Sequence, residues 1–225
     1  MVVTRKVKSR SYDNAGRRTQ SAETKQRIVE AARDLMIERG YRATTIAAIA
    51  EGAGVHVDTI YELVGRKPVL LRELIEQALS GTDGAVVAEE REYVKAIQAE
   101  SDPARKLTIY ARAVRQIQGR MAPLFLALRD ASATEPDAKH VWRETSDRRA
   151  ANMRRLAMDL DAAGGLRAGL SIDEAADVIW ATNSSELYVL LTVERGWQPG
   201  RYERWLADTW CRLLLPDPGP TSDVT

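Results

Sequence analysis

The sequence predicts an all-helical protein with two domains. Apolar residues recur at spacings of three and four along almost every periodic segment, and no segment alternates with a period of two over the length of a strand. Residues typical of helix starts and stops separate these segments. The chain has 225 residues, and Gly81 and Gly84 mark the expected change from a small N-terminal domain (21–80) to a larger one (81–215).

The N-terminal part contains two short helical segments separated by glycines. Thr45 stands where an N-cap belongs, and Gly52 and Gly54 interrupt the pattern just before a second short helix, expected over residues 56–63. Glycine adopts a positive φ without strain, and small alanines let two helices cross closely. This pattern of an N-cap and two short helices separated by glycines is typical of a helix-turn-helix, although ordinary helical bundles also contain it. The apolar stripe before the turn consists of Ile46, Ile49, Ala50 and Ala53.

The remaining helices are placed by their start and stop signals. A capping box at Ser171–Glu174 opens one of them, and Pro123 is expected to break or restart another. The tail over residues 216–225 is expected to be disordered. The expected helices cover residues 22–39, ending at Gly40, and residues 67–80, 103–121, 137–163, 171–195 and 200–215.

Residues 24–75 resemble the TetR family of bacterial transcription regulators. The resemblance implies a three-helix DNA-binding domain followed by a helical domain for ligand sensing and dimerisation. Val64 and His56 depart from the residues usual in the family, so the operator sequence stays open. The matching residues are Arg27-Ile28, Ala31-Ala32, Gly40-Tyr41, Thr44-Thr45, Ile49-Ala50, Ala53-Gly54-Val55, Thr59-Ile60-Tyr61, Lys67 and Leu70-Leu71.

The resemblance assigns DNA contacts to the second helix of this motif, which would enter a major groove. For Asp58 an alternative stays open, in which its charge complements the helix dipole. The residues expected to face or approach base edges are His56, Val57, Asp58, Thr59 and Tyr61. The residues expected to contact phosphates are Thr44, Thr45, Tyr61 and Lys67.

The net charge of +1 is unevenly distributed. Residues 1–20 carry six basic residues and one acid, whereas residues 21–80 have a net charge of −1. We therefore expect residues 1–20 to be a disordered basic arm that contacts DNA. The cations assigned to this contact are Arg5, Lys6, Lys8 and Arg10.

The larger domain has polar residues on otherwise apolar helical stripes, and such groups need partners when they are buried. One interpretation is an effector pocket, to which Asn183 or Glu186 could also contribute. The alternative is pairing within the protein, such as Arg149 with Glu186. The pocket residues expected under the first interpretation are Tyr110, Phe125, Trp142, Arg149, Asn152 and Trp180.

Catalytic and metal chemistry are not expected. The two histidines, His56 and His140, have no second histidine or cysteine at ligand spacing, and no phosphate-binding glycine loop or nucleophile elbow is present. No cofactor is expected. The N-terminus has no secretory signal, no apolar run could cross a membrane, and the lone Cys211 cannot form an internal disulfide. A cytoplasmic location is expected.

These observations together predict a homodimeric transcription repressor that a small molecule releases from a palindromic operator. The helices over 171–195 and 200–215 are apolar on several sides, which predicts that they form the dimer interface. Two alternatives stay open: a DNA-binding regulator without a ligand, and an interaction or scaffold protein without specific DNA binding.

Overall fold

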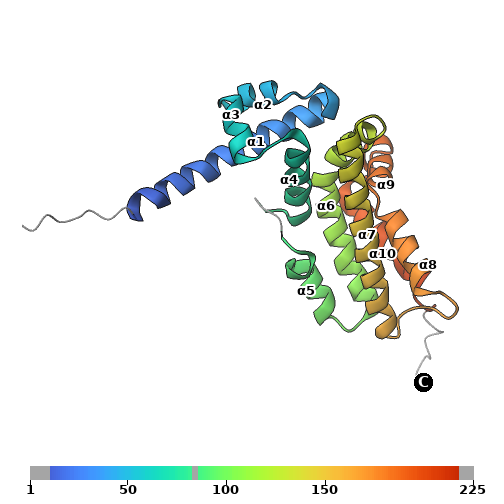
Figure 1. Cartoon of the computed structure of the whole chain (residues 1–225). Coiled ribbons are helices and arrows are strands. Elements are labelled where there is room, and N and C mark those ends of the chain that lie inside the picture. The colour runs from blue at the N-terminus through green and yellow to red at the C-terminus, as the bar shows by residue number, and fades with distance from the viewer. Residues whose placement is uncertain (1–10, 83–85, 218–225) are drawn as a thin grey trace, which may run out of the picture. The chain divides into compact units, whose positions relative to one another are not determined.

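The structure is a computed structural model that describes residues 11–82 and 86–217. Within these ranges the chain forms ten α-helices, two short helical turns and no strand, which confirms the all-helical prediction (Figure 1). The chain divides into two compact units, one ending at Leu71 and the other beginning at Arg72. No helix in the described ranges is long and apolar enough to cross a membrane.

The first unit is built around a core of fully buried side chains, among them Ile28, Met36, Ile49, Ile60 and Leu70. Each helix contributes at least one of these residues. The short helices would not be stable in isolation, so their packing in this core stabilises them. The unit contains α1 (Ser11–Ala43), α2 (Ile46–Ala53), α3 (Val57–Leu63) and the first part of α4 (Lys67–Ser80).

The structure corrects the prediction of a disordered arm over residues 1–20. Helix α1 begins at Ser11, so residues 11–20 are helical. Extending an existing helix adds one hydrogen bond per residue without a new nucleation cost, and the packed part of α1 supplies that nucleus. Residues 1–10 lie outside the described residues. At the other end, Gly40 leaves the helical conformation with φ 77°, at the stop that the sequence predicted.

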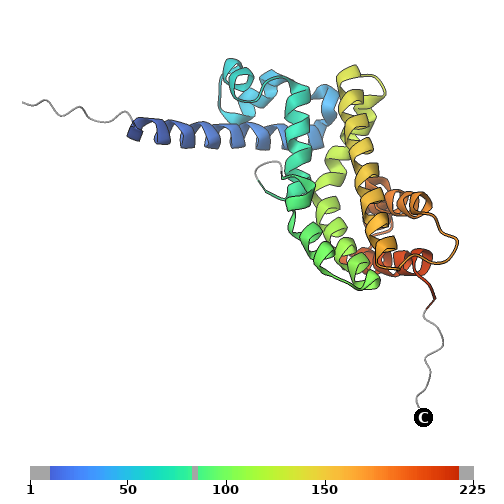
Figure 2. The ribbon, with the colours of Figure 1, turned by 60° about the horizontal axis from the view of Figure 1, so that its bottom comes forward.

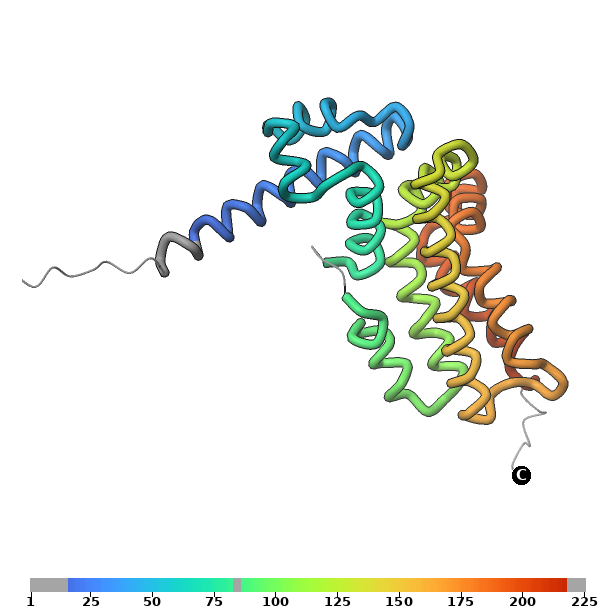
Figure 3. Tube along the Cα trace, viewed as in Figure 1, coloured from blue at the N-terminus to red at the C-terminus, as the bar shows by residue number. Residues whose placement is uncertain are grey.

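The second unit is a helical bundle in which α6 (Pro103–Ser132) and α7 (Pro136–Ala162) run side by side in opposite directions (Figures 2 and 3). Its large core includes Leu107, Tyr202, Leu206 and Trp210. The remaining elements are η1 (Ala88–Glu90), α5 (Glu92–Ala99), α8 (Ile172–Thr182), α9 (Ser185–Val189), the π-helical turn η2 (Leu190–Glu194) and α10 (Pro199–Leu214).

Helix α4 continues across the boundary at Leu71, whereas the sequence placed the domain change at Gly81 and Gly84. The second part of α4 packs within the second unit. There Arg120 donates from Nε to the backbone oxygen of Ala78 at 3.0 Å, and Glu76 forms an ion pair with Arg148.

The expected break at Pro123 does not occur, and α6 is continuous through it. Pro123 faces outward, while its neighbours Met121, Ala122, Leu124 and Phe125 are buried. A proline inside a helix removes one hydrogen bond and costs about 3 kcal/mol. Burial of this apolar run offsets that cost. Tertiary packing therefore keeps α6 continuous, although Pro123 by itself favours a break.

The single helix expected over 171–195 is also corrected, because the chain breaks between α8 and α9. The predicted capping box does open α8, with the Ser171 backbone N–H donating to Glu174 Oε2 at 2.9 Å. The helix then ends at Asn183, whose side chain is buried and hydrogen-bonded to other helices. Ser184 caps α9 by accepting from the Leu187 backbone N–H at 3.2 Å.

One buried cation links three elements of the second unit and can be tested directly. Lys106 is 3% exposed and donates from Nζ to the Ile97 backbone oxygen at 2.8 Å and to Asp159 Oδ2 at 2.7 Å. Replacing it should leave the Ile97 oxygen without a donor and Asp159 without its counterion.

We therefore expect Lys106→Met to lower the free energy of unfolding by about 1–3 kcal/mol, measured by urea denaturation. The control is Lys95→Met, which removes an exposed cation paired with Glu92 and should change the free energy by less than about 0.5 kcal/mol. Equal stabilities of the two variants would contradict the structural role of Lys106.

Candidate functional site

The structure contains the predicted helix-turn-helix in the first unit. Thr45 caps α2, its hydroxyl accepting from the Ala48 backbone N–H at 3.1 Å. Gly54 ends α2 with φ 64°, and its backbone N–H donates to the Glu51 oxygen at 3.1 Å. The left-handed conformation at Gly54 allows α3 to start only three residues later.

One face of helix α3 packs against the core of the unit, and the opposite face is exposed. Ile60 is fully buried and anchors the helix to the core, whereas Val57 and Tyr61 are 37% and 50% exposed. His56 and Asp58 are also exposed, and Thr59 is half-buried. His56 occupies the N-cap position without a side-chain cap hydrogen bond, so its imidazole has no capping role there. The exposed side therefore presents a mixed polar and apolar surface at the start of the helix.

Two residues expected to contact phosphates form hydrogen bonds within their own unit. Thr44 is fully buried and donates its hydroxyl to the Gly40 oxygen at 2.9 Å, so this hydroxyl cannot reach DNA. Lys67 donates from Nζ to the backbone oxygens of Tyr41 and Thr44, and Nζ lies 4.1 Å from the centre of the Tyr41 ring. Both residues hold the turn between α1 and α2, a role the sequence reasoning missed because it depends on contacts across the unit.

The basic arm can be placed only in part. Arg5, Lys6, Lys8 and Arg10 lie outside the described residues. Arg17 and Arg18, further along, are exposed on α1. The role of the arm in DNA binding therefore stays a prediction from charge.

The second unit contains a cavity of about 220 Å³. Residues of α4, η1, α5, α6 and α7 line it, together with Asn183 at the end of α8 and Ser185 at the start of α9. Most of the lining is apolar, including Val114, Ile117, Met121 and Leu156. An apolar cavity with a few converging polar groups is the usual form of a small-molecule site.

Four of the six residues predicted for the pocket line this cavity, namely Tyr110, Phe125, Arg149 and Asn152. The two tryptophans do not. Trp142 packs against Phe125 in a tilted arrangement with ring centres 4.5 Å apart, and Trp180 is 38% exposed and lies against the guanidinium of Arg149 at 4.4 Å. The sequence placed them on suitable helices, but their side chains pack around lining residues instead of reaching the cavity.

A buried polar network borders the cavity. Arg149 donates from Nη1 to Asn183 Oδ1 at 2.8 Å, and Asn183 donates from Nδ2 to the Tyr110 hydroxyl oxygen at 2.9 Å. Gln118 donates to the Asn183 backbone oxygen at 2.5 Å and accepts from the Ser185 hydroxyl at 2.8 Å. The sequence analysis did not select Gln118 or Ser185. Gln118 interrupts the stripe of Val114, Ile117 and Met121, and that interruption was the available signal.

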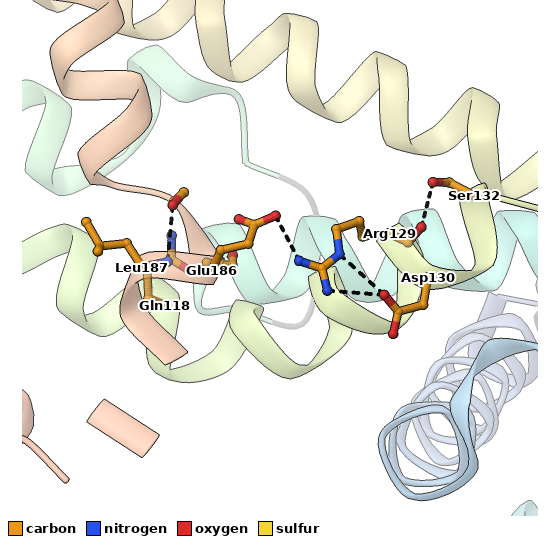
Figure 4. Close-up of polar contacts among 8 residues, drawn as sticks. Gln118, Arg129, Asp130, Ser132, Glu186 and Leu187 are labelled. Atoms are coloured by element: carbon orange, nitrogen blue, oxygen red, sulfur yellow. Dashed lines mark hydrogen bonds and ion pairs between the residues drawn. The ribbon is translucent and has the colours of Figure 1, made fainter. Parts of the chain in front are cut away.

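Arg149 does not form the ion pair with Glu186 that the alternative interpretation proposed. Glu186 contacts Arg129, with Nη1 and Oε1 3.4 Å apart (Figure 4). Burial lowers the pKa of Arg149, while the more distant Tyr110 and Glu186 act in the opposite direction. Arginine nevertheless stays protonated in proteins. Its Nε is buried with no hydrogen-bond partner, so pairing within the protein satisfies this guanidinium only in part.

Comparison with known proteins supplies the family. Residues 28–74 match the model of "Bacterial regulatory proteins, tetR family", a range that includes all of α2 and α3. No curated protein matches the chain.

Several solved structures share the fold. NalD of Pseudomonas aeruginosa, the secondary repressor of the MexAB-OprM multidrug efflux pump, is 20% identical with a TM-score of 0.68, covering 89% of this chain and 100% of its own. The transcriptional regulator FadR of Bacillus subtilis in complex with stearoyl-CoA is 18% identical with a TM-score of 0.66, covering 82% and 96%.

A third similar structure is a putative transcriptional regulator of Saccharomonospora viridis in complex with choline. It is 20% identical with a TM-score of 0.65, covering 86% of this chain and 98% of its own. At these identities the likeness describes the fold, and the matched residues 28–74 carry the family assignment. Residues 28–74 of this chain are therefore a domain of the kind found in the tetR family of bacterial regulatory proteins.

Proposed function

We propose that this protein is a cytoplasmic, homodimeric transcription repressor that a small molecule releases from a palindromic operator. The observation that carries the proposal is α3, which exposes His56, Val57, Asp58 and Tyr61 while Ile60 anchors it in a family-matched helix-turn-helix. A short exposed helix after such a turn is the element that reads base edges in a major groove.

The cavity in the second unit supports the ligand-dependent part of the proposal. It is enclosed mainly by apolar side chains and borders a network of polar groups that is not fully satisfied. Two of the similar structures are complexes with small molecules, stearoyl-CoA and choline. A ligand that changes the spacing of two recognition helices would cost base contacts, because the helices must match two half-sites on one duplex.

Exposed apolar side chains on the last elements of the chain support the dimer. Trp180 on α8, Leu190 and Val193 on η2, and Leu213 on α10 are 38%, 45%, 69% and 42% exposed. Helix α10 packs against both α8 and η2 within the unit. A twofold interface between copies would bury this apolar surface, and stable interfaces of this kind bury on the order of 2,000 Å² or more.

The experiment that tests the proposal is selection of bound fragments from a random DNA pool by the full chain. A repressor of this kind should enrich a palindrome with half-sites about one helical turn apart. Enrichment of no sequence above background would contradict the proposal and favour an interaction protein without specific DNA binding.

The two histidines of the chain provide a matched pair for the recognition helix. We expect His56→Ala to weaken operator binding at least about fivefold, or about 1 kcal/mol, because it removes one base or backbone contact. Its thermal unfolding should stay unchanged, since His56 makes no side-chain cap hydrogen bond. The control His140→Ala removes an exposed histidine of α7 and should alter neither property. Unchanged operator affinity in His56→Ala would remove this residue from the proposed contacts.

For the dimer, we expect the double variant Leu190→Asp, Val193→Asp to sediment as a 25.0 kDa monomer at micromolar concentration. The wild-type chain should sediment at twice that mass, because burying two carboxylates in an apolar interface is strongly unfavourable. Met158→Asp alters an equally exposed apolar residue on α7 and should stay dimeric. A monomeric wild-type protein would be incompatible with the proposed interface.

The basic arm is tested by salt dependence. Each phosphate neutralised adds about 0.9 to the slope of log affinity against log salt, so deleting residues 1–10 should flatten that slope by roughly two to four units per dimer. The conservative variant Arg5→Lys, Arg10→Lys keeps the charge and should keep the slope. Identical slopes for the full-length and shortened proteins would show that the arm does not contact DNA.

A further inference from the structure

We propose that the cavity of the second unit takes a small amphipathic anion, a monocarboxylate, whose charged group pairs with the guanidinium of Arg149. This inference rests on the proposed function, in which a small molecule occupies this cavity. It goes further by naming the chemical class of that molecule and the residue that recognises it.

The charges around the cavity favour an anion. Among the described residues, its lining contains two carboxylates and four guanidinium groups. Both carboxylates are already paired, Glu89 with Arg155 at 3.1 Å and Asp159 with Lys106 at 2.7 Å. Arg148, also in the lining, is paired with Glu76.

Two cations of the lining have no carboxylate partner. Within residues 11–82 and 86–217, no carboxylate oxygen lies within 4.0 Å of a guanidinium nitrogen of Arg91 or Arg149. Arg91 donates from Nε to the Val86 backbone oxygen at 3.1 Å. Both cations are half-buried, and an anionic ligand in the cavity would supply a counter-charge in direct contact.

The hydrogen bonds of Arg149 leave free the part of the group that binds carboxylates. Its Nη1 donates to Asn183, whereas its Nε is enclosed and has no hydrogen-bond partner in the described structure. Nε and Nη2 form one edge of the planar guanidinium, and a carboxylate could accept from both in a bidentate pair once the side chains that enclose Nε move aside. The Trp180 ring and Asn183 hold the guanidinium in place, which reduces the entropy lost on binding.

The rest of the cavity fits an apolar body. Val114, Ile117, Met121, Phe125 and Leu156 supply its walls, and the volume of about 220 Å³ suits a small molecule. That volume is below the roughly 300–1,000 Å³ typical of drug-sized ligand sites. The geometry therefore favours a compact carboxylate with one aromatic ring or a short chain.

The test is calorimetric binding of benzoate, phenylacetate and octanoate to the full-length protein, each compared with its neutral amide. We expect at least one carboxylate to bind at least tenfold more tightly than its amide, because the amide has the same shape and lacks the charge. Amides that bind as well as the acids, or no binding by any of the three acids, would overturn the inference.

Variants of the lining assign the recognition to one residue. Arg149→Met should remove the preference for the acid over the amide, and Arg149→Lys should retain part of it, which separates loss of charge from loss of folding. Arg155→Met removes a lining cation already paired with Glu89, so it should keep the full preference. Retention of the preference in Arg149→Met would contradict the assignment.

Operator release is measured separately, with the same compounds added to the complex of the protein with its selected DNA. Carboxylates that bind in the calorimeter without releasing DNA would support this inference and contradict the proposed mechanism of release. Release of DNA by the amides, with no preference for the acids, would support ligand-dependent release and contradict the anionic ligand class.

Discussion

Asn183 is hydrogen-bonded to two other helices, α6 and α7, while it ends its own. Its side chain accepts from Arg149 of α7 and donates to Tyr110 of α6, and its backbone oxygen accepts from Gln118, also of α6. Just before it, Thr182 accepts from the indole N–H of Trp210 on α10 at 2.7 Å. Buried polar groups must be satisfied, so these partners fix where α8 ends and how the four helices meet.

This network also determines the character of the cavity beside it. The acceptor of the Arg149 Nη1 hydrogen bond is a neutral amide, and Glu186 acts on the charge of Arg149 only from a distance, while the lining carboxylates are paired with other cations. The unit thus contains a large apolar core and, beside the cavity, a half-buried arginine that forms no ion pair with the described residues. A sequence optimised for stability alone would have a carboxylate beside Arg149, or an apolar residue in place of Arg149. Functional sites commonly depart from such optimal stability.

The first unit solves a different problem, because α2 and α3 are too short to be stable alone. Backbone caps and a few fully buried side chains hold them, including Ile49 and Ile60. Lys67 and Thr44 bond to the backbone of the segment between α1 and α2. Thr44 is buried and Lys67 is half-buried, and neither lies on α3; the exposed residues at the start of α3 are His56, Val57, Asp58 and Tyr61. Within this short motif, different residues therefore carry the structural role and the proposed recognition role.

Helical periodicity, caps and glycine stops are local signals, so the helical class, the helix-turn-helix and most helix ends could be predicted from the sequence, and four of the residues it selected line the cavity. The sequence could not determine the continuity of α6 through Pro123, the break at Asn183 or the inward roles of Thr44 and Lys67. It also misplaced Trp142 and Trp180, which pack around the cavity. Each of these features depends on which buried groups meet across helices distant in the chain, and only tertiary packing decides that.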